Sequence, residues 1–168
     1  MPIAQSLLPE FDHETATTRR LLECVPEGQA SWKPHEKSMS LGELAAHLRN
    51  IPDWASATLK HTEVDINPPG GRPSTPSPFQ SVEALLRGFD ESVKQCRAML
   101  VNATDGEMMV PWTLKDGGRP VFSLPRVGVF RAFIMNHMIH HRGQLSVYLR
   151  LCNVALPSIY GPTADTKG

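Results

Sequence analysis

The sequence predicts an all-α fold: a single domain over residues 1–168, built as a four-helix bundle with a short β-hairpin before the last helix. Apolar residues recur at helical spacing in four long segments. A stretch rich in proline and glycine separates the second segment from the third, and a short alternating segment with an Asp-Gly turn precedes the fourth. Long amphipathic helices with one small β element pack most economically as a bundle.

Local signals delimit the four helices. The predicted ranges, in chain order, are residues 3–25, 40–61, 81–103 and 123–151. Pro26 and Gly28 terminate the first helix. Ser40 and Glu43 match the capping box, which satisfies free amides at a helix start, and they begin the second helix. Pro52 is expected to kink that helix because it removes one backbone donor.

The connections between the helices carry fewer signals. They are predicted as a loop over residues 27–37, a crossover loop over residues 67–79 and a hairpin within residues 108–122. Trp32 in the first loop is expected to cover core residues. Ser123 is the expected cap of the last helix, with Pro125 in its first turn, where no amide donor is needed.

Composition excludes several classes of partner. Seventeen basic and seventeen acidic side chains leave no net charge, and no run of Lys and Arg is present, so nucleic acid is not expected as a partner. No apolar stretch reaches the roughly 20 residues that span a bilayer, and the N-terminus has no leader pattern, so we expect a cytoplasmic protein without membrane association. The cysteines form no CxxC pair, which argues against disulfides and a thiolate zinc site: Cys24, Cys96 and Cys152.

The last predicted helix places two histidines on one face. At about 100° per residue, its core-facing stripe contains Phe130, Ile134, His137, His141, Leu145 and Tyr148. His137 and His141 are one turn apart and project side by side, a spacing that helical metal sites use. Two ligands do not complete a site, so a third must come from another helix.

His47 is the candidate third ligand because it combines a mid-helix position with a core-facing stripe. The other candidates lie towards helix ends or in a loop and are expected to be solvated: His13, His35 and His61. The alternative interpretation is that the three core-facing histidines are satisfied by ordinary hydrogen bonds. Burying each imidazole unpaired costs roughly 1 to 3 kcal/mol, whereas one divalent cation satisfies all three at once.

Five motifs extend this pattern over nearly the whole chain. In chain order they are Trp32 with Pro34, Ser40-Leu-Gly-Glu-Leu-Ala-Ala-His47, Ile51-Pro52-Asp53-Trp54, His137-x-x-His140-His141-Arg142-Gly143-Gln144-Leu145, and Pro157-x-x-Tyr160-Gly161-Pro162-x-x-Asp165. Together they resemble the DinB/YfiT-like metalloenzyme superfamily. The HxxHHRGQL run and its distance from the first histidine are the most specific part. Thr163 stands where relatives often have Ser, which leaves the histidines unaffected.

The resemblance implies a four-helix bundle with a variant connectivity and one divalent metal ion per chain. Carried over residue by residue, the implied ligands are His47, His137 and His141, the same three that helical geometry selects. The resemblance also implies that homodimers are common. Apolar residues of the last helix beyond its main stripe favour a homodimer independently: Phe133, Met135, Met138, Ile139 and Val147.

The expected site is catalytic in form. Three protein nitrogens leave a tetrahedral zinc or nickel ion with an open position. A metal-bound water there serves hydrolysis, and a metal-bound thiolate serves thiol transfer, which the resemblance implies with low-molecular-weight thiols. We therefore expect a metal-dependent hydrolase or thiol (S-)transferase acting on a small molecule. The alternatives are a non-enzymatic metal-binding stress-response protein and a structural helical dimer without metal.

Neighbouring residues are expected to support the site. Trp54 is expected to wall the pocket. Glu43 is expected to cap its helix, with orientation of the ligand histidine or action as a base as the alternatives. His140 is placed at the pocket edge or a helix seam, because helical rotation directs it away from the core. Arg142 and Gln144 are expected to fix helix ends or the dimer seam, without a catalytic role.

Overall fold

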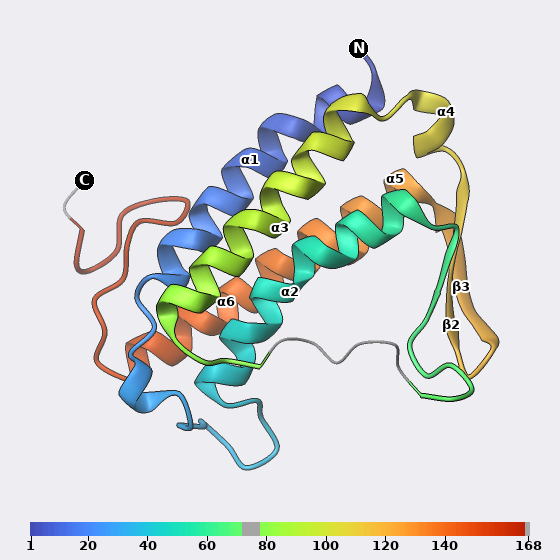
Figure 1. Cartoon of the computed structure of the whole chain (residues 1–168). Coiled ribbons are helices and arrows are strands. Elements are labelled where there is room, and N and C mark those ends of the chain that lie inside the picture. Colours follow the sequence, from blue (N-terminus) through green and yellow to red (C-terminus); the bar gives the residue numbers. More distant parts are fainter. Residues whose placement is uncertain (72–77, 167–168) are drawn as a thin grey trace.

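The computed structural model describes residues 1–71 and 78–166 and is mostly helical, with a small sheet at one end (Figure 1). Among these residues, four long helices carry the fold: α1 (Ile3–Leu22), α2 (Leu41–Lys60), α3 (Val82–Asn102) and α6 (Asn136–Leu151). Short helical elements join them: the 3₁₀-helix η1 (Glu27–Gln29), α4 (Asp105–Met108), α5 (Arg126–Val129) and the π-helix η2 (Phe130–Met135). The strands are β1 (Glu63–Asp65), β2 (Pro111–Asp116) and β3 (Arg119–Pro125). The predicted predominance of helix is confirmed.

The long helices share one hydrophobic core. α1 packs against α3 and α6, and α2 also packs against α3 and α6, so each long helix contacts two others. The largest apolar side chains that are fully buried include Phe11, Phe89, Phe130, Leu48 and Ile51. Burying a side chain of this size stabilises the fold by roughly 1.5 to 3 kcal/mol. This packing brings one face of α2 against α6, which is where the candidate site lies.

The start of α2 is held by the predicted capping box. The Ser40 hydroxyl accepts a hydrogen bond from the Glu43 amide at 3.2 Å, and the Glu43 carboxylate accepts one from the Ser40 amide at 2.6 Å. The Leu41 amide donates to the Trp32 carbonyl at 2.9 Å, which ties the preceding loop to the helix. Trp32 packs against the core, as expected, and its ring meets that of Tyr148 edge-on at 5.5 Å.

The sheet contains one strand that the sequence analysis did not predict. β2 and β3 form an antiparallel pair across a turn in which Gly117 and Gly118 have positive φ, a conformation that glycine adopts without steric cost. β1 adds to β2 in parallel, and its three residues are too few to show a pattern in the sequence. The Asp65 carboxylate accepts hydrogen bonds from the Gly117 and Gly118 amides at 3.0 and 2.6 Å, so β1 also holds the turn.

The predicted start of the last helix is wrong. Ser123 and Pro125 belong to β3, and helix begins at Arg126. Ser123 pairs with Thr113 across the sheet, and their hydroxyl oxygens are 3.1 Å apart. Ser123 therefore does not cap a helix. Pairing with β2 satisfies the backbone of this segment, and this tertiary interaction overrides the local cap signal.

The last helical segment is also not a uniform α-helix, because η2 interrupts it. A π-turn holds one more residue than an α-turn, so the residues after it are rotated relative to the uniform helix assumed from the sequence. The buried row of α6 is Met138, Arg142, Leu145 and Leu149. The prediction that His137 and His141 belong to the core-facing row is therefore wrong. Their side chains are half-buried beside that row, whereas the half-buried Tyr148 packs against the core as expected.

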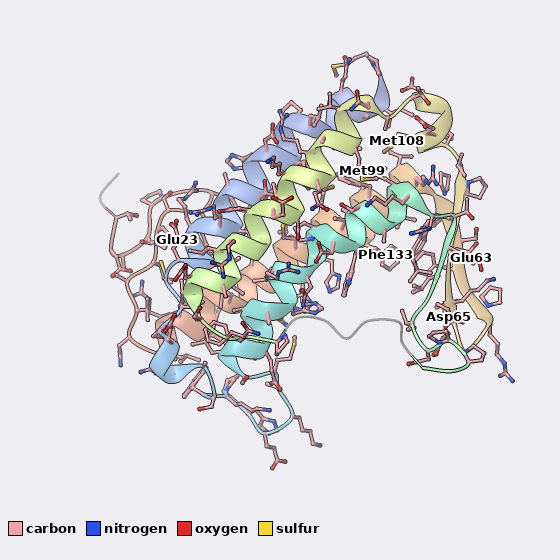
Figure 2. All side chains as sticks on the ribbon, in the orientation of Figure 1. Glu23, Glu63, Asp65, Met99, Met108 and Phe133 are labelled. Carbon is pink, nitrogen blue, oxygen red and sulfur yellow. The ribbon has the colours of Figure 1, made fainter. Side chains whose placement is uncertain are left out.

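The same rotation changes the apolar surface expected for a homodimer. Met135 and Met138 are buried in the core, which removes them from that surface. Phe133 and Val147 remain exposed, by 42% and 57%. Phe133 lies on the side of the helices that faces the sheet, where its ring stacks on Phe122 at a centroid distance of 4.3 Å (Figure 2). The homodimer stays a prediction.

Part of the predicted crossover loop, residues 72–77, lies outside the described residues. Its described ends, residues 67–71 and 78–79, are neither helix nor strand, as expected. Residues 153–166 follow α6 as turns and irregular chain. Within the two described ranges, no helix combines the length and the apolar character that crossing a lipid bilayer requires.

Replacing Ser40 by alanine is expected to lower the free energy of unfolding by about 1 kcal/mol, because α2 loses its side-chain cap. Urea denaturation followed by far-ultraviolet circular dichroism measures the loss. Ser31→Ala is the matched control, since Ser31 is exposed in the loop before α2. Equal stability of the two variants would contradict a stabilising role for the cap.

Candidate metal centre

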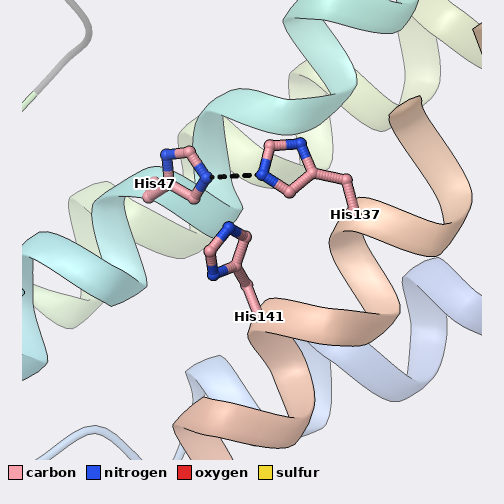
Figure 3. A group of neighbouring side chains, drawn as sticks. All are labelled: His47, His137 and His141. Carbon is pink, nitrogen blue, oxygen red and sulfur yellow. Dashed lines mark hydrogen bonds between the residues drawn. The ribbon is translucent and has the colours of Figure 1, made fainter. Parts of the chain in front are cut away.

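Three imidazoles from two helices converge at the contact between α2 and α6 (Figure 3). His47 projects from α2, and His137 and His141 project from α6. The Nε2 atoms of His47 and His137 are 3.1 Å apart, and one candidate ligand atom from each of the three rings lies within 4.8 Å of the others. In the part of the chain that the structure describes, this is the one group of three or more His, Cys, Asp or Glu side chains with such spacing. The structure thus brings together the three residues that the sequence selected.

Helical spacing and helix packing both contribute to this convergence. His137 and His141 are one turn apart on α6, and their ring centroids are 4.6 Å apart. The ring centroid of His47 lies 5.0 Å from that of His137 and 4.4 Å from that of His141. Because η2 rotates α6, both rings leave the core row and face α2 from the flank, where each stays half-buried.

Burial keeps these imidazoles neutral. It lowers the pKa of His47 to about 4, and the neighbouring His141 and His137 rings contribute to the decrease. Burial is also the largest cause that lowers the pKa of His137 and of His141. A second positive charge this close is unfavourable, which acts in the same direction. At neutral pH the three rings therefore carry lone pairs that a cation can accept.

Two groups outside the trio orient its rings. Nδ1 of His141 lies 2.7 Å from Oε1 of Gln144. When Nδ1 carries the proton, it donates a hydrogen bond to this oxygen, and Nε2 keeps its lone pair. A hydrogen bond to the Phe133 backbone, in η2, raises the pKa of His137 against the effect of burial. Sequence reasoning assigned Gln144 to helix ends or a dimer seam and missed this contact. An amide three residues after a histidine on one helix is the signal that could have revealed it.

Trp54 and His140 lie beside the trio. The Trp54 ring centroid is 5.4 Å from that of His47 and 5.5 Å from that of His137, and the residue is 38% exposed. His140 is exposed, and its ring centroid lies 4.9 Å from that of His141. It is outside the trio, and its expected place at a pocket edge or helix seam stays a prediction.

A hollow of about 430 Å³ adjoins His47 along α2. Small and apolar residues form most of its wall: Ala30, Met39, Gly42, Ala46, Pro78 and Phe79. A side chain at Gly42 would be crowded there, since a Cβ at this position would lie 3.1 Å from the Ala30 carbonyl oxygen and 3.2 Å from the Phe79 ring. Glu43 also lines the hollow, and hydrogen bonds from Ser40 are the main cause that lowers its pKa. Glu43 therefore serves as the cap of α2.

Comparison with known proteins agrees with this geometry. The sequence model of the DinB superfamily matches residues 10–145, a span that contains all three histidines. The chain belongs to the DinB superfamily. The protein YrdA of Bacillus subtilis (strain 168), described as uncharacterized, is 22% identical over 161 residues, which cover 94% of this chain and 88% of YrdA.

Two crystal structures share the fold of this DinB protein. A DinB-like protein from Bacillus cereus ATCC 10987 aligns with a TM-score of 0.68 at 22% identity, covering 93% of this chain and 97% of that one. The DinB-like protein YjoA from Bacillus subtilis aligns with a TM-score of 0.67 at 19% identity, covering 94% and 99% of the two chains. At these identities the likeness concerns the fold alone.

The trio of this DinB protein fits a divalent metal ion by its donor chemistry. Zinc–nitrogen bonds of about 2.0–2.1 Å in tetrahedral geometry place neighbouring ligand nitrogens about 3.3 Å apart. The Nε2 atoms of His47 and His137, at 3.1 Å, are close to that spacing. Neutral imidazoles suit zinc, nickel and copper better than the hard cations that prefer oxygen.

For the metal-free protein, we expect the free energy of unfolding to decrease as the pH falls from 6.5 to about 4. In this window the unfolded chain binds protons on histidines that the folded protein keeps neutral, so acid favours unfolding. Below about pH 4, His47 is protonated in both the folded and the unfolded chain, so its contribution to the free energy of unfolding no longer changes. Urea denaturation over a pH series measures the slope, and histidine NMR titration measures the individual pKa values.

The matched variants are His47→Gln and His140→Gln. Removing His47 should flatten the slope between pH 6.5 and about 4, because its pKa is lowered to about 4. Removing the exposed His140 should change the slope less than removing His47, because its charge is the smallest of the causes that lower the pKa of His137 and of His141. A His47 ring that titrates near 6.5 in the folded protein would contradict the expected effect of burial.

Proposed function

We propose that this DinB protein binds one divalent metal ion per chain through His47, His137 and His141 and acts as a metal-dependent enzyme on a small molecule. The observation that carries the proposal is the convergence of three half-buried imidazoles, two of whose Nε2 atoms are 3.1 Å apart. The proposal takes the four long helices as the four-helix bundle of a DinB-type metal protein, with ligands on α2 and α6.

The residues around the trio suit a reactive site more than a closed structural one. A divalent ion held by three histidines keeps an open coordination position and supplies Lewis-acid activation there. Gln144 orients the His141 ring, and the Phe133 backbone does the same for His137. Trp54 lies against two of the rings. The ligands are thus oriented before any reactant binds.

Zinc or nickel is the proposed metal. The donor set of the trio is entirely imidazole nitrogen, which suits both ions. The cysteines lie outside the trio. Cys96 is buried in the core, where burial raises the pKa of its thiol to about 12, so it stays protonated and is a poor metal ligand.

The hollow beside His47 is the proposed place for the substrate. Its volume of about 430 Å³ suits a small molecule, and its walls are mostly small or apolar. Glu43 is held by the Ser40 amide, so we assign it no role in proton transfer. The proposed reactions are hydrolysis of an ester or amide and transfer of a low-molecular-weight thiol to an electrophile.

Protein purified without chelator and reloaded with zinc or nickel is expected to bind about one ion per chain. His141→Ala should abolish tight binding, since it removes one of three ligands. His140→Ala is the matched control and should keep tight binding, because the adjacent ring is exposed and outside the trio. Elemental analysis and metal titration measure both. The reverse result for the two variants would exclude His141 as a ligand.

Turnover by the metal-loaded protein is expected in one of two substrate panels. One panel pairs low-molecular-weight thiols with electrophilic acceptors, and the other contains esters and amides. Activity should disappear in His141→Ala and persist in His140→Ala, because only the first loses the metal. Stoichiometric metal binding without turnover in either panel would contradict an enzymatic role and favour a non-catalytic metal-binding protein.

A further inference from the structure

The side chain of Arg142, the residue directly after the candidate ligand His141, is buried in the core and is only 1% exposed. A permanent positive charge in this position is costly unless it is paired. Nη1 lies 2.6 Å from the Glu14 carboxylate and donates to the Glu14 backbone carbonyl at 3.1 Å. Nη2 donates to the Tyr160 hydroxyl, and the guanidinium carbon lies 5.0 Å from the centroid of the Tyr160 ring.

Glu14, Arg142 and Tyr160 form a closed network. The Tyr160 hydroxyl donates to the Glu14 carboxylate at 2.9 Å, so each of the three side chains bonds to the other two. The three residues come from α1, from α6 and from the chain after α6. We call this group the arginine network. It joins three separate parts of the fold next to a candidate metal ligand.

We propose that the arginine network positions the metal ligands by fixing the rotation of α6 about its axis. This inference rests on the proposed metal binding by His47, His137 and His141. Arg142 and His141 are neighbours on one helix, about 100° apart around its axis. Any rotation of α6 that moves the guanidinium therefore also moves the imidazole.

The rest of the α6 core row does not provide the same constraint. Met138, Leu145 and Leu149 are apolar, and apolar burial is not directional. Hydrogen bonds between an arginine and a carboxylate fix distance and direction, and they lose energy when either is changed. η2 sets the rotation of α6 through the backbone, but its buried side chains are apolar like those of the core row: Phe130, Ile134 and Met135. The network adds a directional side-chain contact that holds α6, and with it His137 and His141, in this rotation.

A purely stabilising role for the network predicts a different result from a positioning role. Replacing a buried ion pair by apolar residues of similar size often preserves or increases stability, whereas removing one partner alone lowers it. The double variant Glu14→Leu/Arg142→Met should therefore have a denaturation midpoint near or above that of the wild type. If the network positions the ligands, the same variant should bind zinc about tenfold or more weakly.

The experiment compares zinc affinity and metal-free stability in four proteins. These are the wild type, the double variant, Tyr160→Phe and Arg150→Met. Arg150→Met is the matched control, because Arg150 also pairs with a residue after α6, Asp165, but is exposed. Its zinc affinity should stay within about twofold of the wild type. Tyr160→Phe keeps the ring and removes the hydroxyl, so its affinity should fall about threefold.

Cobalt(II) supplies a second readout, since its visible absorption depends on coordination geometry. We expect the cobalt spectrum to change in the double variant and in Tyr160→Phe, and to match the wild type in Arg150→Met. Wild-type affinity and spectrum in a folded double variant would overturn the inference. If the double variant does not fold, Tyr160→Phe decides, and unchanged affinity and spectrum there overturn it. Failure of the wild type to bind zinc would instead overturn the proposed function.

Discussion

The wide turn of η2 is the constraint on which the candidate site depends. Its extra residue rotates α6, so that Met138, Arg142, Leu145 and Leu149 fill the core while the histidines move to the flank that faces α2. In a uniform α-helix the imidazoles would point into the core, where a reactant could not reach them. The π-helix therefore accounts both for the failed prediction of the buried row and for the accessibility of the trio.

The structure brings together the three histidines that the sequence selected, although their helix is rotated from the expected orientation. His137 and His141 are four residues apart within α6, so they turn together and remain a pair whatever the rotation. The start of α2 was also predictable, because the capping box of Ser40 and Glu43 is a local signal. The spacing of apolar residues that predicts the long helices is likewise a local pattern, so their existence could be predicted from the sequence.

The features that sequence reasoning missed depend on distant parts of the chain. β1 exists because it pairs with β2, and three residues show no pattern of their own. Ser123 carries a plausible cap signal, but strand pairing with Thr113 decides its conformation. Arg142 was assigned to a helix end or the dimer seam, because its partner Glu14 lies 128 positions earlier in the chain. Nothing local to these residues distinguishes the observed structure from the expected one.

The protein distributes its charged and titratable groups in an unusual way. Arg142, which is always charged, is buried in the core and paired with Glu14 and Tyr160, while the titratable histidines lie half-buried and neutral. Burial sufficient to lower the pKa of His47 to about 4 still leaves the rings open on one side. The charge of Arg142 lies where its hydrogen bonds can specify helix packing, and the lone pairs of the histidines lie where a metal ion can bind them.

The separation of the two faces of α6 has a consequence for how this scaffold can change. Because the candidate ligands lie outside the core row, exchanging one of them opens no large cavity among Met138, Leu145 and Leu149. Mutations at the flank therefore lower the free energy of unfolding only a little, and a stable chain tolerates more of them before it unfolds. Evolution can alter the metal, the ligand set or the reactant on such a helix while the packed core and the fold are retained. The scaffold is suited to diversification of chemistry on a constant framework.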